Sequence, residues 1–168
     1  MSDTPPAATS GPDLNRLPFV MTAPDRLIGK GHAAGDFLEA YDWVVTEESH
    51  GHLAIRAHLP DHARNPRGQL FGGFTPTYVD LVALFTVRAG PDRLNPDAPR
   101  HWLATTNMRI DYFEPITGPM FTITSTVEKR RGRTVFVTTR FFQGDELAVH
   151  AVTTMRLIDT PTNPLGDA

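Results

Sequence analysis

A single carboxylate, Asp80, is the first residue of this sequence that could do chemistry. It is the only charged residue between Gly72 and Val87, a segment that is otherwise rich in apolar side chains. Buried carboxylates are rare unless they are paired or functional, and burial away from cations raises a carboxyl pKa toward the range that suits a general base. Asp80 is therefore a candidate base, and a structural carboxylate bonded to a backbone group or a tyrosine is the alternative interpretation.

Two adjacent glycines, Gly72 and Gly73, precede the same segment. Glycine lets the backbone approach a ligand closely, and the N–H groups at the start of a helix attract developing negative charge. The pair could therefore polarise a substrate carbonyl, or it could simply make a tight turn into the helix.

The spacing of these two features predicts a site that two chains share. Eight residues separate Gly72 from Asp80, which is about 12 Å of helix rise. A base and a donor that serve one carbonyl should lie roughly 6 Å apart. Two antiparallel copies of the helix across a two-fold axis would bring Asp80 of one chain near Gly72 of the other, so we expect a homodimer.

The segment from Gly73 to Ala89 has the pattern of a buried helix. Apolar residues recur at helical spacing, beginning with Phe74, Tyr78 and Val82, and they occupy most of the circumference. Thr75-Pro76 fits an N-cap followed by a first-turn proline. A further short helix is expected over residues 36–40.

Six other runs have the pattern of β-strands. The first two form a hairpin around the turn at residues 49–51, and the last four are joined by short turns, which predicts antiparallel neighbours. The runs are residues 42–48, 53–59, 104–114, 121–128, 134–142 and 147–157. Together they predict an α+β fold in which an antiparallel sheet wraps around one central helix.

The composition excludes several classes of protein. The chain has 168 residues, which suits one domain, and 16 basic against 19 acidic residues, which argues against a broad nucleic-acid-binding face. It has no cysteine, so disulfides, thiolate catalysis and zinc sites built on sulfur are excluded. No stretch approaches the ~20 apolar residues that span a bilayer, and residues 1–13 lack the pattern of a signal peptide. We therefore expect a cytoplasmic protein with no nucleic-acid partner and no membrane partner.

The 15 prolines mark the boundaries of the expected domain. They concentrate near both ends and in a connector that follows the helix. This distribution predicts mobile tails over residues 1–13 and 160–168 around a single domain over residues 14–159.

The histidines and one basic run are weaker candidates for a site. Among the seven histidines, His50 and His52 could share a strand face and His58 and His62 are four residues apart, but no acidic residue completes a ligand set at either place, so we expect no metal. The run from Lys129 to Arg133 contains Arg130, Arg131 and Arg133 and lies in a turn between two strands. It could be a solvated hairpin tip or a site for phosphates.

Two motifs together resemble a known family. The run Asn65-Pro66-Arg67-Gly68-Gln69-Leu70-Phe71-Gly72-Gly73, with Asp80 seven residues on, resembles the signature of hotdog-fold acyl-CoA thioesterases of the PaaI-like, phenylacetate-degradation type. The run from Thr105 to Pro115 looks like the family's strand after the helix, which ends in Tyr-x-x-Pro. The resemblance covers residues 27–158 and implies the hotdog fold, acyl-thioester hydrolysis and a homodimer that is usually paired again into a tetramer.

The resemblance also implies roles for individual residues. Asp80 would be the general base for water or the nucleophile toward the thioester. The Gly72 N–H would polarise the thioester carbonyl, Asn65 would hold the carboxylate, water or carbonyl, and Thr105 would position the water. Coenzyme A would be part of the substrate, and no other cofactor is expected.

The substrate contacts follow from the same resemblance. The acyl group would lie along the central helix, near Phe71, Gly73, Phe74 and Tyr78. The phosphates of coenzyme A would meet the basic turn that holds Arg130, Arg131 and Arg133.

One departure from the family keeps two alternatives open. The family usually has histidine before Gly-Gly, and here the residue is Phe71. A non-catalytic acyl-CoA-binding or lipid-binding hotdog protein is the first alternative. An enoyl-thioester hydratase or dehydratase is the second, and Phe71 disfavours it because that chemistry relies on a histidine.

Overall fold

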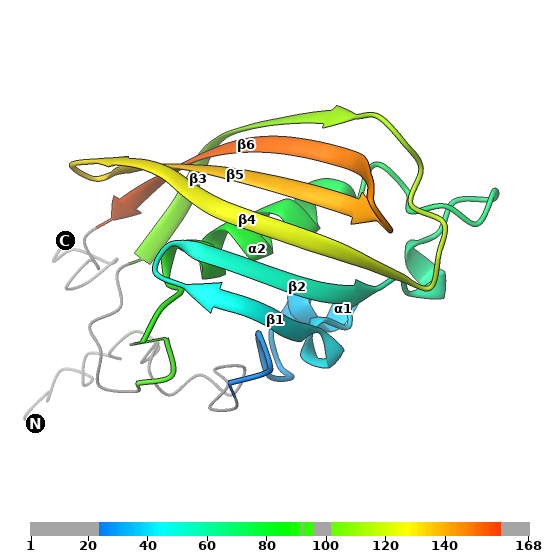
Figure 1. Cartoon of the computed structure of the whole chain (residues 1–168), viewed down its shortest axis with the longest axis horizontal. Coiled ribbons are helices and arrows are strands. Elements are labelled where there is room, and N and C mark those ends of the chain that lie inside the picture. The colour runs from blue at the N-terminus through cyan, green and yellow to red at the C-terminus, as the bar shows by residue number, and fades with distance from the viewer. Residues whose placement is uncertain (1–23, 92, 96–101, 159–168) are drawn as a thin grey trace, which may run out of the picture.

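Six antiparallel strands curve around one long helix in the computed structural model, which describes residues 24–91, 93–95 and 102–158 (Figure 1). The strands are β1 (Val44–Ser49), β2 (His52–His58), β3 (Trp102–Tyr112), β4 (Met120–Arg131), β5 (Thr134–Gln143) and β6 (Glu146–Ile158). The long helix is α2 (Thr75–Val87), and the short helical turns are α1 (Ala33–Phe37), η1 (Ala40–Asp42) and η2 (Asp61–Ala63). The predicted hotdog architecture is confirmed; the predicted tails lie outside the described residues.

The order of the strands differs from the simplest prediction. Short turns were expected to make consecutive strands neighbours, but the order is β1-β2-β4-β5-β6-β3, and β3 pairs with β6 instead of β4. The cause is the connection between β3 and β4, which runs over residues 113–119 and contains Pro115 and Pro119. It is too long and too proline-rich for a hairpin, so β3 becomes an edge strand.

The start of α2 is also one residue earlier than the predicted cap implies. Phe74 occupies the N-cap position without a side-chain hydrogen bond, whereas Thr75 is the first helical residue and is buried. A turn precedes the helix, in which the Phe74 and Thr75 N–H groups donate to the carbonyl oxygens of Phe71 and Gly72. The short helix expected at residues 36–40 lies nearer the N-terminus: α1 ends at Phe37, and the 3-10 turn η1 begins at Ala40. The N-cap of α1, His32, accepts a hydrogen bond from the Gly35 N–H.

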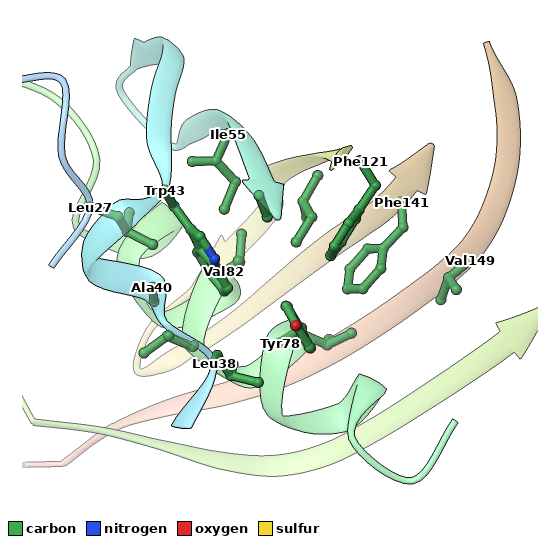
Figure 2. Close-up of a cluster of buried hydrophobic side chains, with 14 of the residues drawn as sticks. Leu27, Leu38, Ala40, Trp43, Ile55, Tyr78, Val82, Phe121, Phe141 and Val149 are labelled. Carbon is green, nitrogen blue, oxygen red and sulfur yellow. The ribbon is translucent and has the colours of Figure 1, made fainter. Parts of the chain in front are cut away.

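An aromatic cluster joins α2 to the sheet (Figure 2). The ring of Tyr78 stacks on Trp43 with centroids 5.3 Å apart, and it meets Phe121 and Phe141 edge-on at 5.6 and 6.1 Å. Tyr78 is completely buried. The face of α2 that carries Tyr78 is therefore the core face.

The Tyr78 hydroxyl has no hydrogen-bond partner among the described residues. Burial raises the pKa of this phenol well above its ordinary value, and the nearby Glu39 carboxylate raises it further. An unpaired buried hydroxyl costs about 1–3 kcal/mol. We therefore expect Tyr78→Phe to raise the free energy of unfolding by about 1 kcal/mol in urea titrations at pH 7.

The same burial sets an alkaline limit on stability. Above pH ~10 an unfolded tyrosine loses its proton while the native Tyr78 keeps it, so the native state binds more protons and stability falls as the pH rises. Tyr78→Phe should flatten this alkaline decline. An unchanged decline, or a loss of stability at pH 7, would contradict the assignment.

Candidate active site

Asp80 lies on the side of α2 that faces β3. It accepts a hydrogen bond from the Thr105 hydroxyl. The carboxylate is half-buried rather than fully buried, and Thr105 is exposed at the edge of the sheet. A β-bulge between Thr105 and Asn107 interrupts the pairing of β3 with β6 at this point, and such bulges re-aim side chains. The structure thus brings together two of the residues predicted for catalysis.

The Gly72-Gly73 turn leads directly into α2. Both glycines are exposed, and neither backbone N–H has a hydrogen-bond partner in the part of the chain that the structure describes. Open N–H groups at the start of a helix suit a developing negative charge. The turn is therefore able to polarise a carbonyl from the side that faces solvent.

Tyr112 holds this turn in place. Its hydroxyl donates to the Gly72 carbonyl oxygen at 2.9 Å, and the Thr75 N–H donates to the same oxygen at 3.2 Å. A trans peptide points its C=O and its N–H in opposite directions, so these bonds fix the direction of the Gly73 N–H as well. Sequence reasoning missed this role of Tyr112, for which the Tyr-x-x-Pro motif is the available signal.

Two phenylalanines flank the glycine turn. A Cβ at Gly73 would lie 2.6 Å from Cε1 of Phe71, so the phenyl ring occupies the space that any side chain at this position would need. Phe71 is 49% exposed, and its ring lies 5.2 Å from that of the half-buried Phe74. Both residues lie where a substrate at the turn could meet them, whereas the buried Tyr78 has no surface to offer.

Asn65 braces the loop that leads to the turn. Its Oδ1 accepts hydrogen bonds from the Arg67 and Gln69 N–H groups at 2.9 and 3.1 Å, and its Nδ2 donates to the Gln69 side chain at 3.2 Å. Asparagine commonly closes loops in this way. Within one chain, Asn65 therefore acts on the loop that ends in Gly72 and makes no hydrogen bond with Asp80.

The register of the sheet shows on which face of the sheet Arg130 lies. Thr105 pairs with Met155, Met155 with Val135, and Val135 with Arg130. Directly paired residues share a face of the sheet, so Arg130 lies on the face that carries Thr105 and Asp80. Three strand spacings separate it from Thr105, which is about 14 Å.

The other basic residues of the hairpin are placed differently. Lys129 pairs with Phe136, which is exposed on the outer face, and Arg131 pairs with Thr134 on that outer face. Arg133 lies in the turn itself. Of the predicted phosphate ligands, Arg130 is the one whose backbone position directs it to the face of Asp80.

Asp80 and Gly72 are anchored at different ends of β3. The Thr105 hydroxyl donates a hydrogen bond to Asp80, and the Tyr112 hydroxyl donates one to the Gly72 carbonyl oxygen. Thr105 and Tyr112 are seven residues apart on β3. That separation is about 23 Å of extended chain. One chain therefore holds a carboxylate near one end of β3 and a turn with open N–H groups at the other.

Residues 24–91, 93–95 and 102–158 hold neither a cluster of metal ligands nor a membrane-spanning helix. No three His, Asp or Glu side chains within these ranges lie close enough to hold a metal ion. No helix within them is both long and apolar enough to cross a membrane.

Comparisons with known proteins agree with the fold. The family model of the thioesterase superfamily matches residues 67–150, which contain the glycine turn, α2 and Thr105. No curated protein sequence matches the chain.

Solved structures give the same result for the fold. A conserved protein from Pseudomonas aeruginosa is 17% identical, with a TM-score of 0.63 over 76% of this chain and 95% of its own. A phenylacetic acid degradation-related protein from Ralstonia eutropha JMP134 is 21% identical, with a TM-score of 0.62 over 76% and 91%. A hypothetical thioesterase from Streptococcus pneumoniae TIGR4, solved with coenzyme A, is 16% identical, with a TM-score of 0.60 over 71% and 88%.

Proposed function

The chain belongs to the thioesterase superfamily, and on this premise we propose that it hydrolyses an acyl-CoA to the free acid and coenzyme A in a site shared by two chains. One observation carries the proposal. Asp80, bonded by Thr105, and the open N–H of Gly72 are the two parts that the reaction needs, and they are held at opposite ends of one exposed edge strand.

The chemistry assigns one task to each part. The Gly72 N–H stabilises the oxyanion that forms when the thioester carbonyl is attacked. Asp80 removes a proton from the attacking water, or attacks the carbonyl itself, and Thr105 orients the carboxylate. When Asp80 acts as the base, collapse of the intermediate breaks the C–S bond and the thiolate takes the proton that Asp80 removed from water. When Asp80 attacks, the same collapse leaves an acyl anhydride on Asp80, and water hydrolyses it to the free acid and supplies the proton of the thiol. Coenzyme A is part of the substrate, and no other cofactor takes part.

The exposed edge of β3 supplies the dimer interface. β3 has 11 residues and pairs on one side only within the described part of the chain, whereas the other edge strand, β1, is shorter and is bridged by Arg26. Unpaired strand edges are ready templates for pairing with another chain. Antiparallel pairing of two copies about Met108, near the middle of β3, places Thr105 opposite the partner's Asp111 and beside the partner's Tyr112, which brings Asp80 toward the partner's Gly72.

The proposal is tested by thiol release from a panel of acyl-CoAs, together with light scattering. We expect release of free thiol and a mass of at least two chains, and the same mass distinguishes a dimer from a tetramer. Binding without thiol release would favour a non-catalytic carrier. Loss of enoyl absorbance without thiol release would favour a hydratase. A monodisperse, active monomer would refute the shared site.

Arg130 provides a test of where coenzyme A binds. Because Arg130 shares the face of Asp80, Arg130→Ala should raise KM for an acyl-CoA about fivefold to tenfold, as expected for one lost charge-assisted contact. Lys129→Ala, on the outer face, is the matched control and should change KM less than twofold. Thioesters of pantetheine, which lack the nucleotide, should be insensitive to both changes. Equal effects of the two variants on acyl-CoA would contradict this placement.

Tyr112 provides a test of the glycine turn. Tyr112→Phe keeps the ring and removes the hydrogen bond to the Gly72 carbonyl oxygen, so kcat should fall about fivefold to tenfold. KM should stay within twofold because the ring contacts remain. Steady-state kinetics distinguish this pattern from a general loss of fold, which would lower the active fraction and leave the kcat per folded site unchanged.

A further inference from the structure

A cavity of about 300 Å³ lies on the β3 side of the glycine turn. Gly72 and Thr75 form one part of its wall, and the end of β3 with the connection that follows forms another. Most of the remaining surface is apolar and comes from Leu70, Phe113, Ile116 and Val149. The cavity therefore adjoins the N–H that the proposed function gives to the thioester carbonyl.

The acyl group and the pantetheine of an acyl-CoA differ in the side chains that suit them in a binding site. Pantetheine carries two amides and leads to phosphates, so it needs hydrogen-bond partners and cations. None of the residues that line this cavity is basic, and one of them, Glu114, is acidic. In the proposed dimer, moreover, Gly72 of one chain lies near the Asp80 end of the partner. The basic turn on that side of Gly72 is therefore the partner's basic turn. Pantetheine thus leaves the carbonyl toward that turn, and the acyl group is directed toward the cavity.

We infer, on the basis of the proposed function, that this cavity binds the acyl group and selects uncharged acyl chains of up to about ten carbons. A volume of about 30 Å³ per water-sized group gives room for roughly ten methylene-sized groups. Glu114 is exposed at the cavity and forms no ion pair within the described residues. Its carboxylate repels an acyl chain that ends in a second carboxylate.

Binding of non-hydrolysable thioethers tests the cavity without any need for turnover. S-alkyl coenzyme A compounds with chains of one to sixteen carbons are titrated into the 168-residue chain by calorimetry. Each fully buried methylene should tighten binding about fourfold, and the gain should stop near ten carbons. At least a tenfold difference between the ethyl and octyl compounds is expected. Equal affinities across the series would overturn the inference.

Phe113→Ala tests whether these residues line the binding site. Phe113 is 56% exposed, so its removal should cost little stability. The substitution should lower the affinity for S-decyl-coenzyme A at least fivefold and leave the affinity for S-methyl-coenzyme A unchanged. Phe136 is also exposed and lies on the outer face of the sheet. Phe136→Ala is therefore the matched control and should change neither affinity. Equal effects of the two variants would overturn the inference, provided that light scattering shows the same mass for both.

Glu114→Gln tests the selection against charge. Wild type should bind S-(5-carboxypentyl)-coenzyme A at least fivefold more weakly than S-hexyl-coenzyme A. Glu114→Gln should remove most of this difference, whereas Glu47→Gln, on the opposite edge strand, should retain it. A difference that Glu114→Gln leaves intact would refute the selection. Length-dependent binding without hydrolysis of any acyl-CoA would leave the cavity assignment standing and refute the proposed function.

Discussion

Asp80→Asn is expected to lower kcat for acyl-CoA hydrolysis by about 10³-fold, within the range found for removal of a general base. Asparagine keeps the size of the side chain and can still accept the hydrogen bond from Thr105. It can neither take a proton from water nor attack the thioester. The loss should therefore fall on kcat, with little change in the affinity for an S-alkyl coenzyme A.

The measurement is thiol release at saturating acyl-CoA, with Asp61→Asn as the control. Asp61 is fully exposed in η2 and, among the residues that the structure describes, its side chain pairs only with Arg64, so its substitution should leave kcat within twofold. Circular dichroism and light scattering check that both variants keep the fold and the mass. If Asp80→Asn kept more than a tenth of the wild-type kcat, Asp80 would be a structural carboxylate.

Gly72→Pro is the second change with a large expected effect. Proline removes the backbone N–H that is open at the start of α2, and loss of one oxyanion donor costs about 10²- to 10³-fold in kcat. Gly72→Ala retains the N–H and is the matched comparison. A Cβ at this position would lie 3.7 Å from the Tyr112 ring, an ordinary contact, so we expect a loss of less than about tenfold.

The two Gly72 variants are compared by kcat and by melting temperature. A lower kcat of Gly72→Pro at an unchanged melting temperature would locate the effect in the N–H. Equal kcat values for proline and alanine would show that the N–H of Gly72 takes no part, and the Gly73 N–H would then be the remaining donor at this turn.

Much of this site could be predicted because its signals are local. A charged residue inside an apolar helical run is visible in the sequence, and so is a pair of glycines before that run. Thr105 was assigned only by resemblance, and the structure places its hydroxyl against Asp80. Phe71, which replaces the family histidine, packs its ring over Gly73 and adds apolar wall beside the turn.

The rest depends on contacts between distant parts of the chain. Tyr112 and Gly72 are 40 residues apart, and no periodicity links them. The position of β3 at the sheet edge follows from a proline-rich connection and from the pairing of β2 with β4, whereas turn rules describe only neighbouring strands. A helix that is apolar nearly all round does not reveal which face meets the sheet, and for this reason Tyr78 was expected at the substrate and is found in the core.

Mixing two inactive variants tests the shared site most directly. Asp80→Asn and Gly72→Pro chains are co-refolded in equal amounts, so about half of the dimers contain one chain of each kind. In such a dimer one site combines both defects, and the other combines the intact Asp80 with the partner's intact Gly72. We predict that the mixture regains about a quarter of the wild-type activity. A mixture that stays as inactive as its two parents would show that each site lies within one chain.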